Sequence, residues 1–346
     1  MTKTGKKKKK RSAAAAGIAI AVIAICFAAA YISCSPVDKS EKTAVLVTVE
    51  PGSGSSLIAS ALKEKNLIKS EAAFKLRAKM TGKADDFKAG TYALNKSMST
   101  GEIIAVIASG ETAGKTFTVA EGQPIYKMAE QLDSAGIVDK KDFYNEIENG
   151  KFDYPFMKYL PEGTARLEGF LYPDTYEVAV DADAHEVLDV MLKRFNQVIG
   201  SDKDIFETVI KASVIQKEAG NTDEMKKVSS VIDNRIKKGM PLQMDSIISY
   251  IHKEDKIRAT YSDIDVESDY NPYKNKGLPP GPICSPGKDA IDAAKNPDST
   301  KYIYFVASSK MNGTNVFSTN YKDFLKDKKA FDKAYEKYIK EHPEAE

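Results

Sequence analysis

The clearest alternation of apolar and polar positions lies between residues 201 and 241, where it has the period of an α-helix. Apolar side chains recur every three or four positions until Gly220 and again after Thr222, which predicts two helices joined by a short turn. Ser201 and Asp204 have the spacing of a capping box at the start of the first helix, and a glycine and a proline near position 240 end the second. The apolar positions are Ile205, Val209, Ala212 and Ile215, then Met225, Val228, Ile232 and Ile236.

The residues before position 114 predict a smaller α/β unit. Residues 44–49 have the pattern of a β-strand, residues 51–54 that of a turn, and an amphipathic helix follows. A shift of about 70 residues aligns this unit with a second one, and so predicts that a strand, turn and helix occur twice. Chance likeness between two such generic units is the alternative. The aligned pairs include Thr48 and Thr118, Gly52 and Gly122, Ile58 and Met128, Leu62 and Leu132, Leu67–Ile68 and Ile137–Val138, and Phe74 and Tyr144.

The C-terminal part of the chain predicts a hairpin followed by a helix. Residues 301–307 are apolar and aromatic, Asn312-Gly313 is typical of a tight turn, and residues 315–317 form the returning strand. Residues 324–339 then show helical spacing with many lysines, which favours a solvated surface helix over a binding surface.

The first 34 residues predict a membrane anchor. Residues 13–32 carry no charge and have about the length that crosses a hydrocarbon core as a helix. Basic residues lie only on the N-terminal side, which predicts a cytoplasmic N-terminus and an extracytoplasmic body. Two alternatives are a signal peptide cleaved after Ala28-Ala-Ala30 and a lipoprotein modified at Cys34, although Tyr31 is a poor first residue for the latter motif.

Charge and composition exclude some classes of partner. The formal net charge is +2, but 7 of the 51 basic residues lie before position 12, which leaves 44 basic against 49 acidic residues in the rest of the chain. An acidic body argues against nucleic acid as a partner. The three cysteines form no disulfide framework, and the three histidines lack the spacing of metal ligands. We expect no metal and no cofactor.

Glu218 is the residue whose position best suits chemistry. It follows Val214 and Ile215 by four and three positions, and so shares a helix face with apolar neighbours. Burial of a carboxyl group raises its pKa, which keeps a proton available near neutral pH for general acid catalysis. The alternative is a solvated carboxylate at a helix end beside Lys217.

Other polar side chains are candidates for binding a ligand. Glu168 and Asp174 flank an aromatic, proline-containing loop, although an Asp-Thr pair also suits a turn. Asp245 suits a sugar hydroxyl or, alternatively, the cap of a helix at residues 246–252. Tyrosine and asparagine side chains can stack on sugar rings and bind hydroxyls, and such residues precede the stiff loop 277–282, whose role is alternatively structural. The predicted substrate-binding residues are Glu168, Tyr172, Asn234, Gln243, Asp245, Tyr270, Asn271 and Tyr273.

Several blocks together resemble the endolytic murein transglycosylases of the MltG (YceG-like) family, and they extend over most of the chain after Thr48. The blocks are residues 167–176, 215–218, 234–235, 243–245, 277–282 and 302–307. The resemblance implies that Glu218 is the catalytic acid and base, that the part before about Gly114 is a LysM-like module, and that the substrate is the glycan strand of peptidoglycan. It implies wall synthases and the elongation or division machinery as partners.

The chain departs from the family pattern at two positions. Gln216 stands where the family usually has a second glutamate, which leaves Glu218 as the one carboxylate of its block. Asn315 stands where family members commonly have histidine, and an amide cannot exchange a proton near neutral pH.

These observations predict an α+β protein with an N-terminal transmembrane helix. The expected parts are a cytoplasmic tail (1–11), a transmembrane helix (12–33), a tether (34–43), a LysM-like α/β module (44–113) and a larger mixed α+β catalytic domain (114–346). The resemblance implies that a membrane-anchored lyase cleaves nascent strands between MurNAc and GlcNAc, leaves 1,6-anhydro-MurNAc ends and so terminates elongation. The competing class is a non-catalytic peptidoglycan-binding scaffold that recruits synthases.

Overall fold

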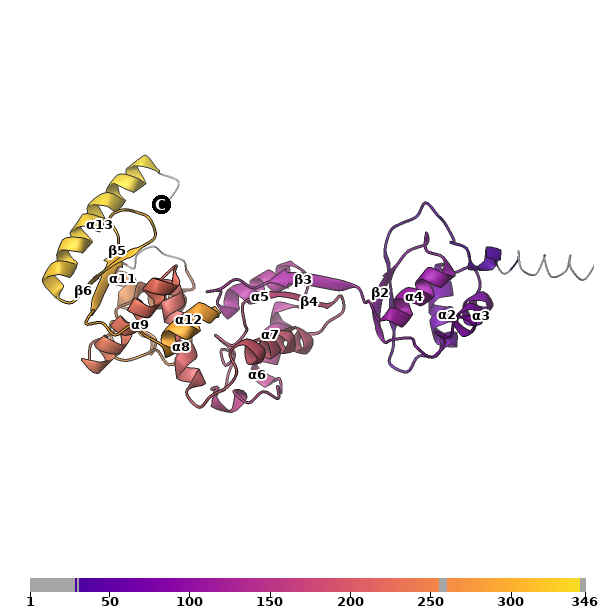
Figure 1. Ribbon diagram of the computed structural model, residues 1–346, viewed down its shortest axis with the longest axis horizontal. Coiled ribbons are helices and arrows are strands. Elements are labelled where there is room, and N and C mark those ends of the chain that lie inside the picture. Colours follow the sequence, from indigo (N-terminus) through magenta and orange to yellow (C-terminus); the bar gives the residue numbers. More distant parts are fainter. Residues whose placement is uncertain (1–28, 30, 255–259, 343–346) are drawn as a thin grey trace, which may run out of the picture. The chain divides into compact units, whose positions relative to one another are not determined.

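The computed structural model describes residues 29, 31–254 and 260–342, and it confirms the mixed α+β class (Figure 1). Close contacts divide the chain into two compact units. The smaller comprises the residues up to Lys115 together with Ala179–Asp181, and the larger comprises Thr116–Val178 and the residues from Ala182 onward. Each unit has its own hydrophobic core.

In the described part of the smaller unit, two strands and three helices surround the hydrophobic core. Strand β1 (Val45–Val49) pairs antiparallel with β2 (Gly90–Leu94), and Val47 lies opposite Tyr92. Between and after the strands come α2 (Ser55–Glu64), α3 (Glu71–Met80) and α4 (Thr100–Ser109). Alternate strand residues and one face of each helix meet in the core, as the periodicity predicts. The α4 helix starts with a capping box between Ser99 and Glu102.

The larger unit begins with elements that repeat this order. Strand β3 (Gly114–Thr118), α5 (Ile125–Ser134) and α6 (Lys140–Asn149) follow one another as β1, α2 and α3 do, and β3 then pairs with β4 (Thr175–Ala179). Backbone geometry repeats as well, since Gly52 and Gly122 have φ of 79° and 76°, and Asn66 and Gly136 have φ of 55° and 61°. The second strand, turn and helix unit that the sequence predicts is therefore present.

Cross-strand contacts extend the repeat, and one aligned pair needs correction. The Thr48 and Thr91 hydroxyls lie 2.9 Å apart, as do those of Thr118 and Thr175. The predicted pairing of Phe74 with Tyr144 is wrong by one residue, because Phe74 and Phe143 are the buried aromatic residues of α3 and α6. The segment that leads into the second of these helices is one residue shorter, so the offset falls from 70 to 69 there.

The rest of the larger unit is mainly helical. It contains a 3-10 turn (Met157–Tyr159), α7 (Ala184–Val198), α8 (Ile205–Glu218), α9 (Thr222–Lys237), α10 (Asp245–His252), α11 (Tyr261–Ile264) and α12 (Lys288–Lys295). Helix α12 packs against α8 and α9, and α10 packs against α8. The two helices predicted around position 220 are thus α8 and α9. The capping box predicted for α8 is wrong, because Asp204 is itself the N-cap residue and its side chain makes no capping hydrogen bond.

The C-terminal hairpin is present, with its first strand shorter than predicted. Strand β5 (Tyr304–Ala307) pairs antiparallel with β6 (Asn315–Ser318), and α13 (Tyr321–Glu341) packs along this hairpin (Figure 1). No residue of α13 is buried, in agreement with the predicted surface helix.

The predicted transmembrane helix falls almost entirely outside the described residues. Within the ranges that the structure describes, no helix combines the length and the apolar character that crossing a bilayer requires.

Candidate active site

Glu218 is the last residue of α8, and the local sequence explains why the helix ends there. Ala219 leaves the helical conformation with φ −139° and ψ 135°, and Gly220 follows it. Asn221 then caps α9, because its side-chain oxygen accepts a hydrogen bond of 3.0 Å from the backbone N–H of Glu224. The turn between the two helices holds the Glu218 side chain half-buried, as the apolar neighbours predicted.

The surroundings of Glu218 favour its protonated form. Burial raises the pKa of its carboxyl group, and the negative charge of Asp245 adds to that effect. Two groups act in the opposite direction. The hydroxyl of Ser246 donates a hydrogen bond of 2.6 Å to Oε1, and the positive charge of Arg235 stabilises the carboxylate. The balance leaves the pKa of Glu218 above its ordinary value, which suits a group that must give up a proton and take one back.

Arg235 fixes the position of the segment that carries Asp245 and Ser246. Its side chain is only 7% exposed, and its Nε donates a hydrogen bond of 2.7 Å to the carbonyl oxygen of Ile303. Its Nη1 donates to the carbonyl oxygen of Leu242, and the guanidinium lies 5.3 Å from the centre of the Tyr304 ring. These contacts tie α9 to the start of α10 and to the C-terminal hairpin. Sequence reasoning placed Arg235 in a family block but gave it no role in the site.

Asp245 and Tyr273 form a second polar pair in the same region. The Tyr273 hydroxyl donates a hydrogen bond of 2.5 Å to Oδ1 of Asp245, the first residue of α10. Burial and the neighbouring Asp245 raise the pKa of Tyr273, so its phenol stays protonated. Gln243 is exposed and left-handed, with φ of 51°, and its N–H donates to the carbonyl oxygen of Pro272. This bond joins the segment before α10 to the loop that carries Tyr273.

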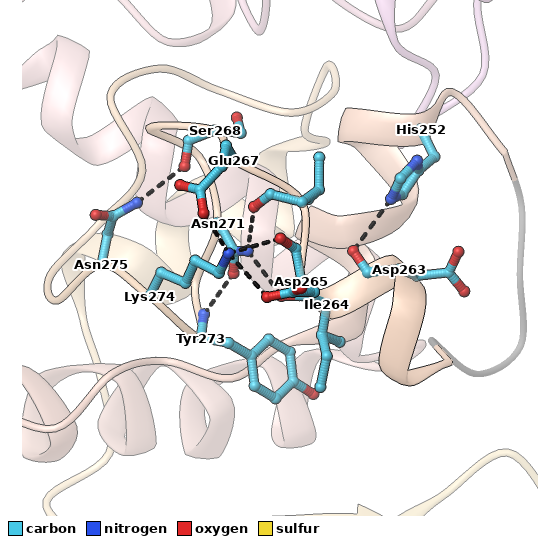
Figure 2. Close-up of polar contacts among 11 residues, drawn as sticks. His252, Asp263, Ile264, Asp265, Glu267, Ser268, Asn271, Tyr273, Lys274 and Asn275 are labelled. Carbon is cyan, nitrogen blue, oxygen red and sulfur yellow. Dashed lines mark hydrogen bonds and ion pairs between the residues drawn. The ribbon is translucent and has the colours of Figure 1, made fainter.

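That loop, residues 264–275, is held by its own polar side chains (Figure 2). Asn271 is fully buried, and its Nδ2 donates to the carbonyl oxygens of Ile264 and Val266 at 2.9 and 2.8 Å. Its Oδ1 accepts the N–H of Tyr273 at 2.9 Å. On the exposed side of the loop, Lys274 forms ion pairs with two acidic residues, Asp265 and Glu267. Asn271 was predicted to bind substrate, but its amide is used inside the loop, where it positions Tyr273.

Three other predicted residues make contacts with other parts of the protein. The side chain of Asn234 donates to the carbonyl oxygens of Thr300 and Tyr302 at 3.0 and 2.9 Å, and so anchors the segment before β5. Tyr172 is buried, and its carbonyl oxygen accepts the Tyr176 hydroxyl at 2.5 Å. The Tyr270 ring packs beside Tyr250, with the ring centres 5.5 Å apart. For these residues the predicted contact with substrate stays a prediction.

Glu168 is buried elsewhere in the larger unit. It is 3% exposed, and its oxygens accept the N–H of Ile125 at 3.1 and 3.2 Å, which satisfies the start of α5. The Tyr250 hydroxyl donates to Oε2 at 3.2 Å. Burial raises the pKa of Glu168 to about 8. We predicted a residue lining a sugar groove, but the structure places Glu168 in the core, where its oxygens are taken by protein donors.

Asn315 links the C-terminal hairpin to the turn after Glu218. Its Nδ2 donates to the carbonyl oxygen of Glu218 at 3.2 Å and to Oε2 of Glu224 at 3.0 Å. Its backbone N–H donates to both oxygens of Glu224 at 3.1 Å. A neutral amide at this position therefore holds the backbone of the candidate acid and a buried carboxylate together.

The structure thus brings four of the predicted residues together, and it adds one that was missed. Glu218, Gln243, Asp245 and Tyr273 gather around the start of α10, and Ser246 contacts Glu218 directly. The available signal for Ser246 was its place at the start of the predicted helix 246–252, where free N–H groups attract an acceptor.

One cavity of the larger unit lies among other residues. A cavity of about 370 Å³ is lined by residues of α6 and the start of α7, among them Asp142, Glu146 and His185, and includes none of the predicted site residues. Among residues 29, 31–254 and 260–342, no group of three or more His, Cys, Asp or Glu side chains is arranged to hold a metal ion.

Comparison with known proteins gives a consistent result. The YceG-like family matches residues 47–330. An endolytic murein transglycosylase of Bacillus subtilis is 36% identical over 325 residues, which cover 88% of this chain and 87% of the relative. A protein of the same name from Streptococcus pneumoniae D39 is 29% identical over 79% of this chain, which spans only 56% of that relative. The crystal structure of a YceG-like protein of Listeria monocytogenes superposes with a TM-score of 0.56 at 29% identity, over 82% of this chain and 99% of that one.

Proposed function

Since this chain belongs to the YceG-like family, and its relatives are named endolytic murein transglycosylases, we propose that it cuts the glycan strands of peptidoglycan as a lytic transglycosylase. The observation that carries the proposal is the state of Glu218. A half-buried carboxyl group with a raised pKa, held by a hydroxyl at 2.6 Å, suits general acid catalysis at a glycosidic bond.

The reaction we propose needs no water. Glu218 donates its proton to the oxygen that bridges MurNAc C1 and the next sugar as the bond between C1 and that oxygen breaks. The resulting carboxylate then accepts the proton of the MurNAc 6-hydroxyl while that oxygen closes on C1. One chain leaves with a new hydroxyl group and the other ends in 1,6-anhydro-MurNAc, and Glu218 is protonated again.

A single acidic residue is sufficient for this reaction because the substrate supplies the nucleophile. An intramolecular hydroxyl can reach an effective molarity of about 10⁵ M or more, far above that of a second molecule in solution. Positioning the sugar is then more important than activating water. Gln243, exposed beside the site, and the Tyr273 ring offer groups for that positioning.

Asp245 supports a second candidate, an ordinary glycoside hydrolase. Hydrolases use a pair of carboxyl groups, one as acid and one as base or nucleophile. Asp245 is close enough to Glu218 to raise its pKa. Oδ1 of Asp245 already accepts the short hydrogen bond from the Tyr273 hydroxyl. The products separate the two candidates, because hydrolysis leaves reducing ends and transglycosylation leaves anhydro ends that are lighter by one water.

The test is to incubate the full chain, kept in detergent micelles, with purified uncrosslinked glycan strands and to analyse the fragments by mass spectrometry. We expect internal fragments with anhydro ends. Glu218→Gln should abolish them while glycan binding persists, because an amide cannot act as a general acid near neutral pH. Glu207→Gln, at an exposed position of the first turn of the same helix, is the matched control and should cleave normally.

Each other outcome has a definite meaning. Reducing ends would replace the transglycosylase proposal with the hydrolase. Binding of glycan without any cleavage by the wild-type protein would favour the scaffold, which docks on the wall and recruits synthases. Anhydro ends produced by Glu218→Gln at the wild-type rate would refute the mechanism.

We further propose that the segment at residues 12–33 anchors the protein in the cell membrane with the body outside. Basic residues precede this segment, and the body carries excess acidic residues. In this position the enzyme meets strands as synthases extend them, and each internal cut ends a strand. The smaller α/β unit is then a LysM-like module that docks on glycan. External protease added to cells without their wall should remove the body, and a protected body would contradict this placement.

A further inference from the structure

The start of α10 lies against the carboxyl group of Glu218. Ser246 is the second residue of this helix, and its hydroxyl donates to Oε1 of Glu218 at 2.6 Å. The N-cap residue, Met244, makes no side-chain capping hydrogen bond, and the backbone N–H of Ser246 contributes to stabilising the Glu218 carboxylate. The carboxyl group of one helix therefore takes the place that a capping side chain would occupy on another.

This contact has a consequence for which oxygen carries the proton. In a neutral carboxyl group the carbonyl oxygen is the better hydrogen-bond acceptor, so a hydroxyl that donates to one oxygen favours the hydroxyl hydrogen on the other one. The hydrogen bond that the Ser246 hydroxyl donates to Oε1 therefore favours a Glu218 proton on Oε2. Resting on the transglycosylase function proposed above, we propose that Ser246 is a positioning residue that presents Oε2 to the glycosidic oxygen and stabilises the carboxylate formed when the proton leaves.

The charged groups around Glu218 come from several elements, and Ser246 acts among them. Asp245 from α10 opposes ionisation of Glu218, and Arg235 from α9 favours it. Tyr273 from the 264–275 loop stays neutral beside Asp245. From β6, Asn315 joins the Glu218 carbonyl oxygen to the carboxylate of Glu224.

Among these groups, the Ser246 hydroxyl donates a hydrogen bond to the Glu218 carboxyl. The direction of the effect follows: without the hydroxyl, the Glu218 carboxylate loses a donor, and the pKa of Glu218 rises.

The experiment compares Ser246→Ala, Ser246→Thr and Ser246→Cys with the wild-type full chain across pH. The general acid works only when protonated, so kcat/KM falls as pH rises through the pKa of Glu218 in the free enzyme. In Ser246→Ala this falling limb should move up by about one pH unit, and kcat below the limb should fall roughly tenfold with little change in KM. Ser246→Thr retains a hydroxyl and should restore the wild-type limb, and Ser246→Cys, a weaker donor, should lie between them.

A matched control and a direct titration complete the test. Ser249→Ala removes a half-buried hydroxyl one turn later in α10 and should leave the limb in place. Carbon-13 NMR of labelled glutamate side chains, with the Glu218 signal assigned by its loss in Glu218→Gln, follows the ionisation of Glu218 without any need for activity.

An unshifted Glu218 titration in Ser246→Ala, or an equal shift in Ser246→Thr, would overturn the role of Ser246. If instead the wild-type protein makes no anhydro ends and yet the titration shifts as expected, the proposed reaction fails while the contact between Ser246 and Glu218 keeps its electrostatic role.

Discussion

The buried carboxyl group of Glu168 predicts how the stability of the protein depends on pH. Its carboxyl group is 3% exposed, and burial raises its pKa from 4.5 to about 8, although the hydrogen bonds from Ile125 and Tyr250 favour the carboxylate. Below pH 4.5 the group is protonated in both the folded and the unfolded chain. Between pH 4.5 and 8 the unfolded chain releases the proton while the folded chain keeps it, so stability falls as pH rises.

The magnitude follows from the size of the shift. A rise from 4.5 to about 8 corresponds to roughly 5 kcal/mol, at about 1.4 kcal/mol per pKa unit, and this is an order-of-magnitude figure for a fully buried group. Glu168→Gln has nearly the same shape and does not ionise. We expect the free energy of unfolding of this variant, relative to wild type, to increase from pH 5 to pH 9 by up to about this amount.

Urea unfolding followed by circular dichroism at several pH values between 5 and 9 measures the difference. Because both proteins contain the same smaller unit, its contribution cancels when the variant is compared with wild type. Glu162→Gln, at an exposed position six residues earlier, is the control and should show no such trend. A difference between Glu168→Gln and wild type that stays constant from pH 5 to pH 9 would show that Glu168 ionises normally in the folded protein.

Two further substitutions test the electrostatics and the packing. Asp245→Asn removes the negative charge beside Glu218, so the falling limb of kcat/KM should move to lower pH, opposite to Ser246→Ala; a move to higher pH in the same rate measurements would contradict this. Gly169→Ala should destabilise the larger unit by about 2–4 kcal/mol in urea unfolding, because Gly169 has φ of 84° and an added Cβ would lie 2.6 Å from Cγ1 of Val209. Gly163→Ala, where φ is 103° and nothing lies within 4 Å, should show the backbone strain alone, and equal losses at both sites would refute the packing argument.

The pattern of apolar residues was sufficient to predict the helices around the site. Ile205, Val209 and Ile215 recur with helical spacing, and all three are buried in α8, so the half-buried position of Glu218 followed from its own sequence neighbourhood. The pattern of apolar residues does not predict the helix cap at Asn221 or the contact between Ser246 of α10 and Glu218. A cap depends on backbone dihedral angles, and a contact between helices depends on how they pack.

The candidates outside α8 show the limit of reading polar residues from sequence. A buried amide and an exposed one look alike in sequence. The amides of Asn271 and Asn234 both donate to backbone carbonyl oxygens, which the sequence did not indicate, and the predicted contact of Asn234 with substrate stays a prediction. Ser246 was overlooked for the converse reason. A serine near a helix start is ordinary until another element brings a carboxyl group against it.

The equivalent glycines in the two copies of the strand and helix unit have different surroundings. An added Cβ at Gly52 would meet nothing within 4 Å, whereas one at Gly122 would lie 3.5 Å from Cγ of Gln216 and 3.6 Å from Cδ of Lys217. The second turn thus supports the last turn of α8 from outside, while the first is unencumbered by protein atoms. Any other residue would strain the backbone at both turns, because both glycines have positive φ, but at the second turn its side chain would also touch the helix that ends in Glu218.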